Sequence, residues 1–153
     1  MQNAAWKNAA RVLKSLKQAA ALSSQRVLSM PLGELAVNIR SNGTFNVKAT
    51  RLKALASWWQ QNFARTGTMS TTQLRRSLLD VPGTGHETAD CILLYIFARP
   101  QLVIDTYFRR VVARVVVIDS SLPYDQLQTV LAKNLPQGSQ WLGEAHAVVM
   151  AHC

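Results

Sequence analysis

The sequence predicts an all-α fold. Apolar residues recur at helical spacing through most of the chain, in about eight short segments, and almost no segment alternates as a strand would. The chain has 153 residues, of which 48% are hydrophobic and 16% are charged, which is enough for a globular domain with its own core. We therefore expect one helical domain over residues 1–153.

The first half of the chain divides into helices at its polar residues and prolines. Ser23 or Ser24 can cap a short helix that ends before Pro31, and Pro31 can open the next helix, which runs through Ile39. Gly43, within SNGTFN, suits a left-handed residue that ends this helix. Two apolar stripes predict longer helices before Ser23 and after SNGTFN. The first consists of Trp6, Ala9, Leu13, Leu16 and Ala20, and the second of Leu52, Leu55, Ala56, Trp59 and Phe63.

The second half continues the same pattern. A loop, RTGTMST, precedes a helix that carries Leu74 and Leu78, and another helix begins after the turn PGTG. Asp105 can cap the helix TYFRRVVARV, and Ser121 and Pro123 can begin the next one. WLGEAHAVVMAH predicts a last helix.

The charge of the chain indicates a polyanionic partner. The formal net charge is +9, which favours nucleic acid over a membrane surface. No apolar run is long enough to cross a bilayer, and the N-terminus is typical of an amphipathic helix and not of a signal peptide. Cys91 and Cys153 are too few to predict a disulfide framework or a closed metal site. We expect a cytoplasmic, nucleoid-associated protein without a metal.

The stretch LLDVPGTGHETADCILLY, residues 78–95, predicts a hairpin between two helices, over about residues 72–98. Its turn requires glycine at left-handed backbone angles. Backbone N–H groups of such a turn, at a helix N-terminus, form an anion site that can hold a DNA phosphate without reading sequence. The expected contacts are Gly83, Thr84, Gly85 and His86. Taken alone, the motif is more typical of a plain helix connector.

Four motifs in order carry a family resemblance. QNAAWKN is similar to TQNTAWKN, IRSNGTFNVKATRLKAL to IRPAGYYNxKAxRLKAL, VPGTGHETADCILLY to LPGIGxETADAILLY, and RPQLVIDTYFRRVVAR to RPVFVVDAYTRRILSR. The chain thus resembles the helix-hairpin-helix/Gly-Pro-Asp superfamily of DNA glycosylases, the endonuclease III relatives. Within this superfamily, the pattern ETADxILxY in the chain is most similar to that of the 3-methyladenine DNA glycosylase III type. The resemblance implies an endonuclease III-like helical domain.

The resemblance places a catalytic aspartate at Asp105. A carboxylate suits N-glycosidic cleavage because the departing base leaves an oxocarbenium-like sugar. Asp105 can also act simply as a helix N-cap, and the two roles are compatible. We expect its carboxylate to be ionised at neutral pH, stabilised by backbone N–H groups and nearby arginines.

Glu87 occupies the position at which bifunctional relatives carry a Schiff-base lysine. A carboxylate cannot form an imine with the sugar, so the resemblance implies a monofunctional enzyme without β-lyase activity. The alternative is that Glu87 only complements the helix dipole. Glu87 and Trp6 are the candidate residues of a base pocket, although Trp6 also fits a core position.

Further DNA contacts follow from the same resemblance. Gln2 falls where relatives insert a glutamine into the gap left by a flipped base. SNGTFN matches a loop that approaches the opposite strand, with Asn42 and Phe45 as the contacts, or it is only a helix break. Basic residues near the motifs, Lys48 and Arg109 among them, fit a face that follows the phosphates.

Relatives carry an apolar helix before the first motif and a further segment after their closing helix, which WLGEAHAVVMAHC resembles. The resemblance therefore implies that the chain is incomplete at both ends. In many relatives the missing tail holds a four-cysteine iron–sulfur loop. Because Cys91 and Cys153 are the only cysteines, we expect no iron–sulfur cluster and no other cofactor.

The implied function is a DNA glycosylase of base excision repair that hydrolyses the N-glycosidic bond of a damaged base, an alkylated purine first. Its expected partner is double-stranded DNA, and we expect a monomer. Two alternatives stay open. One is a non-catalytic DNA-binding remnant that keeps the hairpin and the basic face; the other is a glycosylase for another lesion, such as mismatched uracil or thymine.

Overall fold

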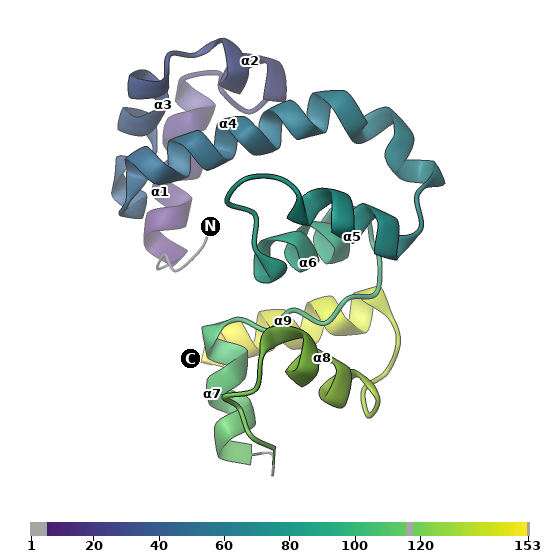
Figure 1. The fold of residues 1–153 in the computed structure, drawn as a ribbon. Helices are drawn as coiled ribbons and strands as arrows, with labels where there is room; N and C mark the ends of the chain where they lie inside the picture. Colours follow the sequence, from purple (N-terminus) through teal and green to yellow (C-terminus); the bar gives the residue numbers. More distant parts are fainter. Residues whose placement is uncertain (1–5, 116–117, 153) are drawn as a thin grey trace. The chain divides into compact units, whose positions relative to one another are not determined.

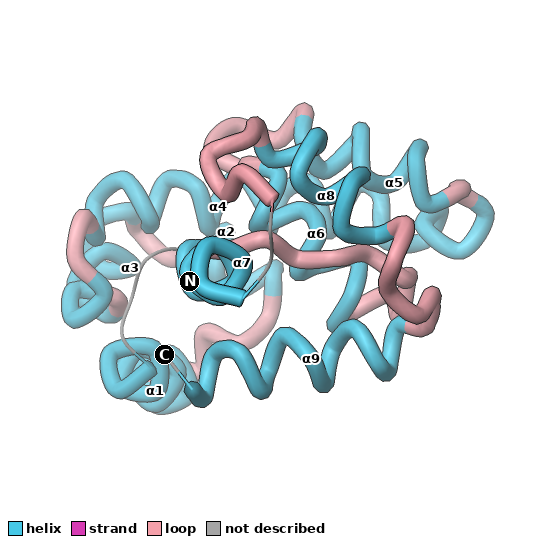
Figure 2. The backbone as a smooth tube through the Cα atoms, turned by 90° about the horizontal axis from the view of Figure 1, so that it is seen from below, coloured by secondary structure: helices cyan, strands magenta, loops and turns pink. Residues whose placement is uncertain are grey.

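All regular structure in the described part of the chain is helical (Figure 1). The computed structural model describes residues 6–115 and 118–152. These residues form nine α-helices and two short 3-10 helices joined by loops, without a strand among them (Figure 2). The predicted all-α fold is confirmed. No helix in these ranges is long and apolar enough to cross a membrane.

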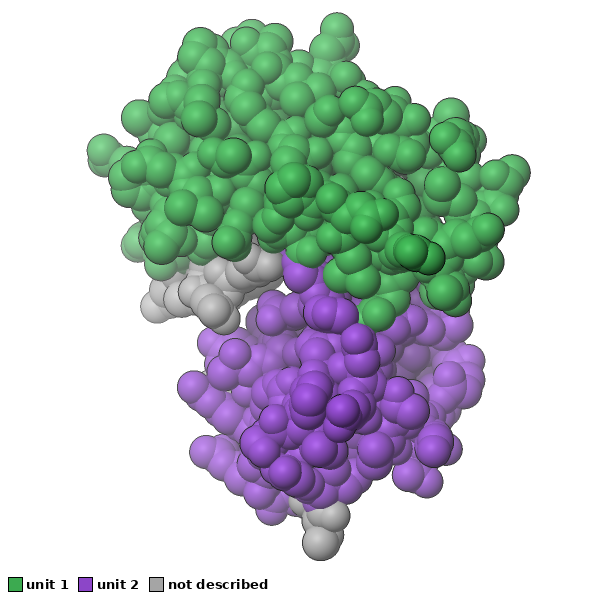
Figure 3. Space-filling model, viewed as in Figure 1, with its two compact units in different colours: residues 1–84 green, residues 85–153 purple. Residues whose placement is uncertain are grey.

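The chain divides into two compact units, Met1–Thr84 and Gly85–Cys153 (Figure 3). The division falls within the predicted hairpin, directly after Thr84. The first hairpin helix and the turn therefore belong to unit 1, and the second hairpin helix belongs to unit 2. The single domain expected over residues 1–153 stays a prediction.

The helices of unit 1 begin and end at the residues that their caps dictate. Ser23 accepts a hydrogen bond from the N–H of Arg26 at 3.2 Å, which confirms the predicted cap. Ser70 and Gln73 form a reciprocal capping box at the start of the first hairpin helix. Gly43 has a φ of +55°, which favours glycine, but its ψ of 159° lies outside the left-handed helical region, which Thr44 adopts instead. The elements are α1 (Trp6–Gln18), α2 (Ser24–Ser29), α3 (Leu32–Asn38), η1 (Arg40–Asn42), α4 (Phe45–Asn62), η2 (Phe63–Thr68) and α5 (Thr71–Leu79).

The core of unit 1 forms where α4 packs on α2 and α3. Both predicted stripes are wrong in detail. On α1, Val12 is buried while Leu13 is 56% exposed, because neighbouring residues lie 100° apart around a helix. On α4, Trp58 is buried and its Nε1 donates to Oγ of Ser77 at 2.8 Å. Phe63 is 51% exposed because α4 ends one residue earlier, and the predicted loop after it is largely the 3-10 helix η2.

Unit 2 has its own apolar core. The extended segment Leu102–Ile104 is buried against Leu127 of α8 and Leu142 of α9. Asp105 caps α7, and Pro123 stands at the N-cap of α8, both as predicted. The elements in the described residues are α6 (His86–Tyr95), α7 (Thr106–Val115), α8 (Tyr124–Ala132) and α9 (Ser139–His152).

Candidate active site

Asp105 stands at the N-terminus of α7, and its residue is only 8% exposed. Its Oδ1 accepts a hydrogen bond from the N–H of Phe108 at 2.7 Å, which is the geometry of an N-cap. Burial alone would raise the pKa of Asp105. The side chain of His146 and the N–H groups of Phe108 and Tyr107 outweigh burial and place this pKa below its ordinary range. The carboxylate is thus ionised at neutral pH, but the side chain that favours its ionised form is a histidine and not the expected arginines.

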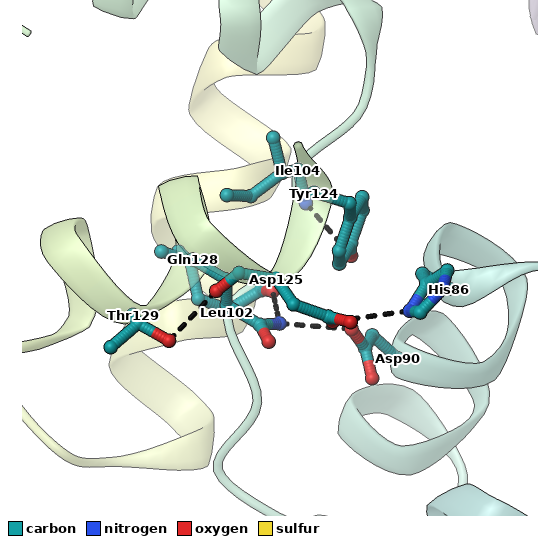
Figure 4. Close-up of polar contacts among 8 residues, drawn as sticks. All are labelled: His86, Asp90, Leu102, Ile104, Tyr124, Asp125, Gln128 and Thr129. Atoms are coloured by element: carbon teal, nitrogen blue, oxygen red, sulfur yellow. Dashed lines mark hydrogen bonds and ion pairs between the residues drawn. The ribbon is translucent and has the colours of Figure 1, made fainter. Parts of the chain in front are cut away.

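Buried and half-buried polar groups of α6 and α8 hold the segment that precedes this N-cap (Figure 4). Nε2 of Gln128 donates to the carbonyl oxygen of Leu102 at 2.6 Å and to Oδ2 of Asp90 at 2.9 Å. The N–H of Ile104 donates to the hydroxyl of Tyr124 at 3.2 Å. Asp90 is fully buried, and burial together with the charge of Asp90 raises the pKa of Tyr124. These bonds fix the backbone that carries the catalytic candidate.

His86, a predicted DNA contact, is the first residue of α6 and is directed toward α8 (Figure 4). Its Nδ1 lies 3.1 Å from Oδ1 of Asp125, and its ring centroid lies 5.3 Å from that of Tyr124. Both members of the ion pair are partly exposed, so the pair adds little to stability, but it sets the direction of the imidazole. The expected contact of His86 with a phosphate stays a prediction.

Three polar side chains of α6 interact electrostatically with Asp105. Glu87, Cys91 and Tyr95 follow one another at intervals of four residues and therefore share one side of the helix. Burial and the charge of Asp105 raise the pKa of Glu87. Burial and the carboxylate of Glu87 raise the pKa of Cys91 to about 11, so its thiol is neutral at neutral pH. Burial and the neighbouring Cys91 and Asp105 also raise the pKa of Tyr95. Only Glu87 was predicted here, although the spacing of polar residues in an apolar helix was a usable signal.

His146 of α9 lies between Asp105 and Tyr95 and is 8% exposed. Its Nε2 lies 3.7 Å from Oδ2 of Asp105, within ion-pair distance but beyond hydrogen-bond distance. Its Nδ1 lies 2.6 Å from the hydroxyl of Tyr95. The sequence carried no signal for this role, because a single histidine in an apolar helix is equally typical of a core residue. The fold alone brings the three side chains together.

The hairpin turn belongs to unit 1 up to Thr84, whose N–H donates to the carbonyl oxygen of Val81 at 3.0 Å. Gly83 has φ +83°, so this position requires glycine as predicted. Gly85, the N-cap of α6 in unit 2, has φ −91° and ψ 178°, which any residue adopts. Of the two turn glycines, Gly83 is therefore the one that meets the left-handed requirement.

The other predicted DNA contacts of unit 1 differ in how they are placed. Phe45 opens α4 and is 38% exposed. Lys48 is half-buried, and burial together with the charge of Arg51 lowers its pKa. Asn42 ends η1, and Trp6 begins α1, but their side chains lie outside what the structure describes. Gln2 lies outside the described residues altogether.

Arg109 of α7 has a structural task inside unit 2. Its Nη1 donates to the carbonyl oxygens of Ser120 and Leu122, at 2.6 Å and 2.9 Å, and so ties the loop before α8 to α7. A guanidinium has further N–H donors, so the predicted phosphate contact stays a prediction. Among the described residues, no group of three or more His, Cys, Asp or Glu side chains is placed to hold a metal ion.

A family model for the HhH-GPD superfamily of base excision DNA repair proteins matches residues 1–137. The chain belongs to this superfamily. Its match covers the hairpin, Asp105 and the helices on either side, and the resemblance inferred from the motifs is confirmed.

Individual HhH-GPD relatives agree with this assignment. A protein of Methanocaldococcus jannaschii, named among the DNA repair glycosylases, is 36% identical over 157 residues, which cover 99% of this chain and 71% of the relative. Endonuclease III of Rickettsia prowazekii is 31% identical over 127 residues, which cover 80% of this chain and 56% of that enzyme.

Solved structures show the same fold. The 3-methyladenine DNA glycosylase of Helicobacter pylori, bound to 1,N6-ethenoadenine, superposes with a TM-score of 0.74 at 28% identity over 86% of this chain and 63% of that one. A trapped covalent complex of endonuclease III with DNA gives a TM-score of 0.79 at 23% identity, over 97% of this chain and 66% of that one, and supports the fold alone. The chain thus spans about two thirds of these solved relatives.

Proposed function

We propose that this HhH-GPD chain is a monofunctional DNA glycosylase, which hydrolyses the N-glycosidic bond of an alkylated purine in duplex DNA. The observation that carries the proposal is the carboxylate of Asp105. It is buried, held at a helix N-terminus, and has a pKa below its ordinary range. An ionised carboxylate in a site of low polarity is the group that stabilises a developing sugar cation most strongly.

The reaction proceeds by departure of the base with the electrons of its bond to C1′. The positive charge that forms on the sugar is stabilised by Asp105, and a water molecule then adds at C1′ and gives up a proton. Oδ1 of Asp105 is occupied by the N–H of Phe108, while Oδ2 is directed toward His146 and makes no hydrogen bond with it. We assign to Oδ2 the contact with the cation or with the attacking water.

The absence of a lyase step in this proposal follows from the chemistry of Glu87. This residue lies in the first turn of α6, and its carboxylate interacts with that of Asp105. A carboxylate cannot form the imine through which a lysine or amine opens the sugar ring. The expected product is an intact strand with an abasic site.

Two observations favour duplex DNA containing an alkylated purine. The net charge of +9 suits a phosphate backbone, and the relative from Helicobacter pylori binds a modified adenine. A thymine/uracil-DNA glycosylase of Methanothermobacter thermautotrophicus is also similar, with 28% identity over 88 residues. The substrate test therefore includes mismatched uracil and thymine beside methylated and etheno-modified purines.

The deciding experiment compares wild type with Asp105→Asn on this panel of duplexes. Asparagine keeps the size and the capping ability of the aspartate but removes its charge. Base release should fall by at least about a hundredfold, the scale of losing one electrostatic partner of a transition state. Asp119→Asn is the matched control, since Asp119 is an exposed aspartate whose carboxylate bonds to Ser121 within its own turn.

Strand breaks should appear only after alkali treatment, and borohydride should trap no covalent complex. A trapped complex would refute the monofunctional assignment. If wild type binds duplex DNA but releases no base from any lesion, the chain is a non-catalytic DNA-binding protein. If Asp105→Asn releases bases as fast as wild type, Asp105 is only a helix cap.

A further inference from the structure

The imidazole of His146 is the buried polar group of unit 2 that the proposed chemistry leaves unexplained. Its Nε2 is buried and makes no hydrogen bond to any described residue. A buried donor or acceptor without a partner is destabilising, so such an atom calls for a functional explanation. Nε2 faces Oδ2 of Asp105 at 3.7 Å. Hydrogen bonds of a catalytic group are commonly long without substrate and shorten when substrate binds.

The hydroxyl of Tyr95 can hold His146 in the form that carries its proton on Nε2. The hydroxyl has a single proton and two acceptors in reach, Nδ1 of His146 at 2.6 Å and the carbonyl oxygen of Gly143 at 3.3 Å. When the hydroxyl donates to Nδ1, a neutral imidazole must carry its proton on Nε2. When the imidazole is charged, Nδ1–H donates to the hydroxyl oxygen, and the hydroxyl turns to Gly143. In both states an Nε2–H group is directed at Asp105.

We propose that His146 is a positioning residue for Asp105, held by Tyr95 in the form that directs Nε2–H at the carboxylate. The N–H of Phe108 fixes one oxygen of this carboxylate at 2.7 Å, and Nε2–H of His146, 3.7 Å from the other oxygen, fixes its orientation when the contact shortens on substrate binding. Two donors on different atoms determine the plane of a carboxylate, which one donor does not. The inference rests on the proposed role of Asp105.

The charges around Asp105 make such a donor necessary. Glu87 carries a second carboxylate toward Asp105, and the groups of Cys91 and Tyr95 on the same side of α6 bring no positive charge. His146 is the side chain that lowers the pKa of Asp105. Because the active form of Asp105 is the ionised one, removal of His146 should move the acid limb of the pH–rate profile to higher pH.

The first test reads the tautomer directly and does not depend on enzyme activity. The chain has three histidines, so 15N-labelled histidine gives a simple long-range 1H–15N spectrum, in which His146→Gln identifies the signals of His146. In the neutral state, wild type should show the Nε2–H form. Tyr95→Phe removes the hydroxyl that donates to Nδ1 and should shift the population toward Nδ1–H. A wild-type spectrum of the Nδ1–H form would overturn the proposal, even for a protein that releases no base.

The second test measures base release in a single turnover across pH. His146→Leu should lower the rate at neutral pH by about tenfold or more, a scale reached when a catalytic group is misplaced, and should move the acid limb to higher pH. His146→Gln should recover most of the rate, because its amide N–H₂ can replace Nε2–H. The loss in Tyr95→Phe should shrink at a pH low enough to charge the imidazole, since a charged imidazole has both N–H groups.

Glu144→Gln is the control, since Glu144 is exposed on the same helix and bonded to Gln140. A purely structural role for His146 predicts another outcome. His146→Leu and His146→Gln would then lose the same factor at every pH, in proportion to their loss of thermal stability. If wild type releases no base while the tautomer behaves as described, the proposed enzyme function fails and the positioning of Asp105 stands.

Discussion

The two glycines of the hairpin turn, Gly83 and Gly85, should respond in opposite ways to alanine. Gly83 has φ +83°, and a Cβ there would come within 2.6 Å of Cδ and 2.7 Å of Nε of Arg51. Left-handed backbone disfavours alanine by about 1–2 kcal/mol. Moving the Arg51 side chain off its rotamer adds about 1 kcal/mol. Gly83→Ala should therefore destabilise the protein by about 2–3 kcal/mol, or roughly 4–12 °C in Tm for a chain of this size.

Gly85→Ala is the matched control, because Gly85 has φ −91° and no atom lies within 4 Å of its added Cβ. Alanine raises the stability of the fold because it restricts the unfolded chain, and lowers it because alanine is a weaker N-cap than glycine. The two effects on the free energy of unfolding nearly cancel, within about 1 kcal/mol. The assay is thermal and urea unfolding followed by circular dichroism. Equal unfolding midpoints for the two variants would refute the argument, because only one position has the strained geometry.

The same pair separates folding from DNA binding. If the turn holds a phosphate beside Gly85, a methyl group at this position should weaken binding without unfolding the protein. Affinity for duplex DNA, measured over a range of salt, should fall for Gly85→Ala at temperatures where both proteins are folded, and the salt dependence should become shallower. Unchanged affinity and salt dependence in Gly85→Ala would place the phosphate elsewhere.

Two further variants probe the groups around Asp105. Gln128→Leu removes the donor that Asp90 and the carbonyl oxygen of Leu102 share. The free energy of unfolding, measured by urea titration, should fall by about 2–4 kcal/mol. A change near zero would show that other donors replace Gln128. Glu87→Gln should raise Tm at neutral pH, because the raised pKa of Glu87 penalises its ionised form in the folded state. This gain should vanish below the ordinary glutamate pKa of about 4.3, and a gain that persists there would refute the electrostatic cause.

The helices were predictable from the sequence because their signals are local. Ser23, Gly43 and Pro123 act on the residues next to them, and the apolar spacing needs no tertiary information. The predicted apolar stripes were wrong where tertiary packing decides which of two adjacent residues is buried, as it does for Val12 and Leu13. A single sequence does not show which of two adjacent apolar residues meets the core.

The candidate site was predictable only where a motif spans consecutive residues. Asp105 and Glu87 lie within such motifs. His146 lies 41 positions beyond Asp105, on another helix, and only the packing of α7 on α9 brings the two together. Long-range pairs of this kind leave no trace in the spacing of one sequence. The same holds for Arg109, whose bonds to Ser120 and Leu122 depend on how the loop before α8 folds back.

Asp105 and Glu87 carry the same functional group, and their surroundings move the two pKa values in opposite directions. Asp105 receives N–H donors at a helix N-terminus together with the imidazole of His146, which outweigh its burial. For Glu87, burial and the negative charge of Asp105 prevail, and its pKa rises. As the pH rises from acid, Asp105 therefore loses its proton before Glu87 does. The order matters for the proposed chemistry, because the carboxylate assigned to the sugar cation is the one that ionises first. Keeping Glu87 beside it lowers the stability of the fold at neutral pH, as expected where a site is arranged for function and not for stability.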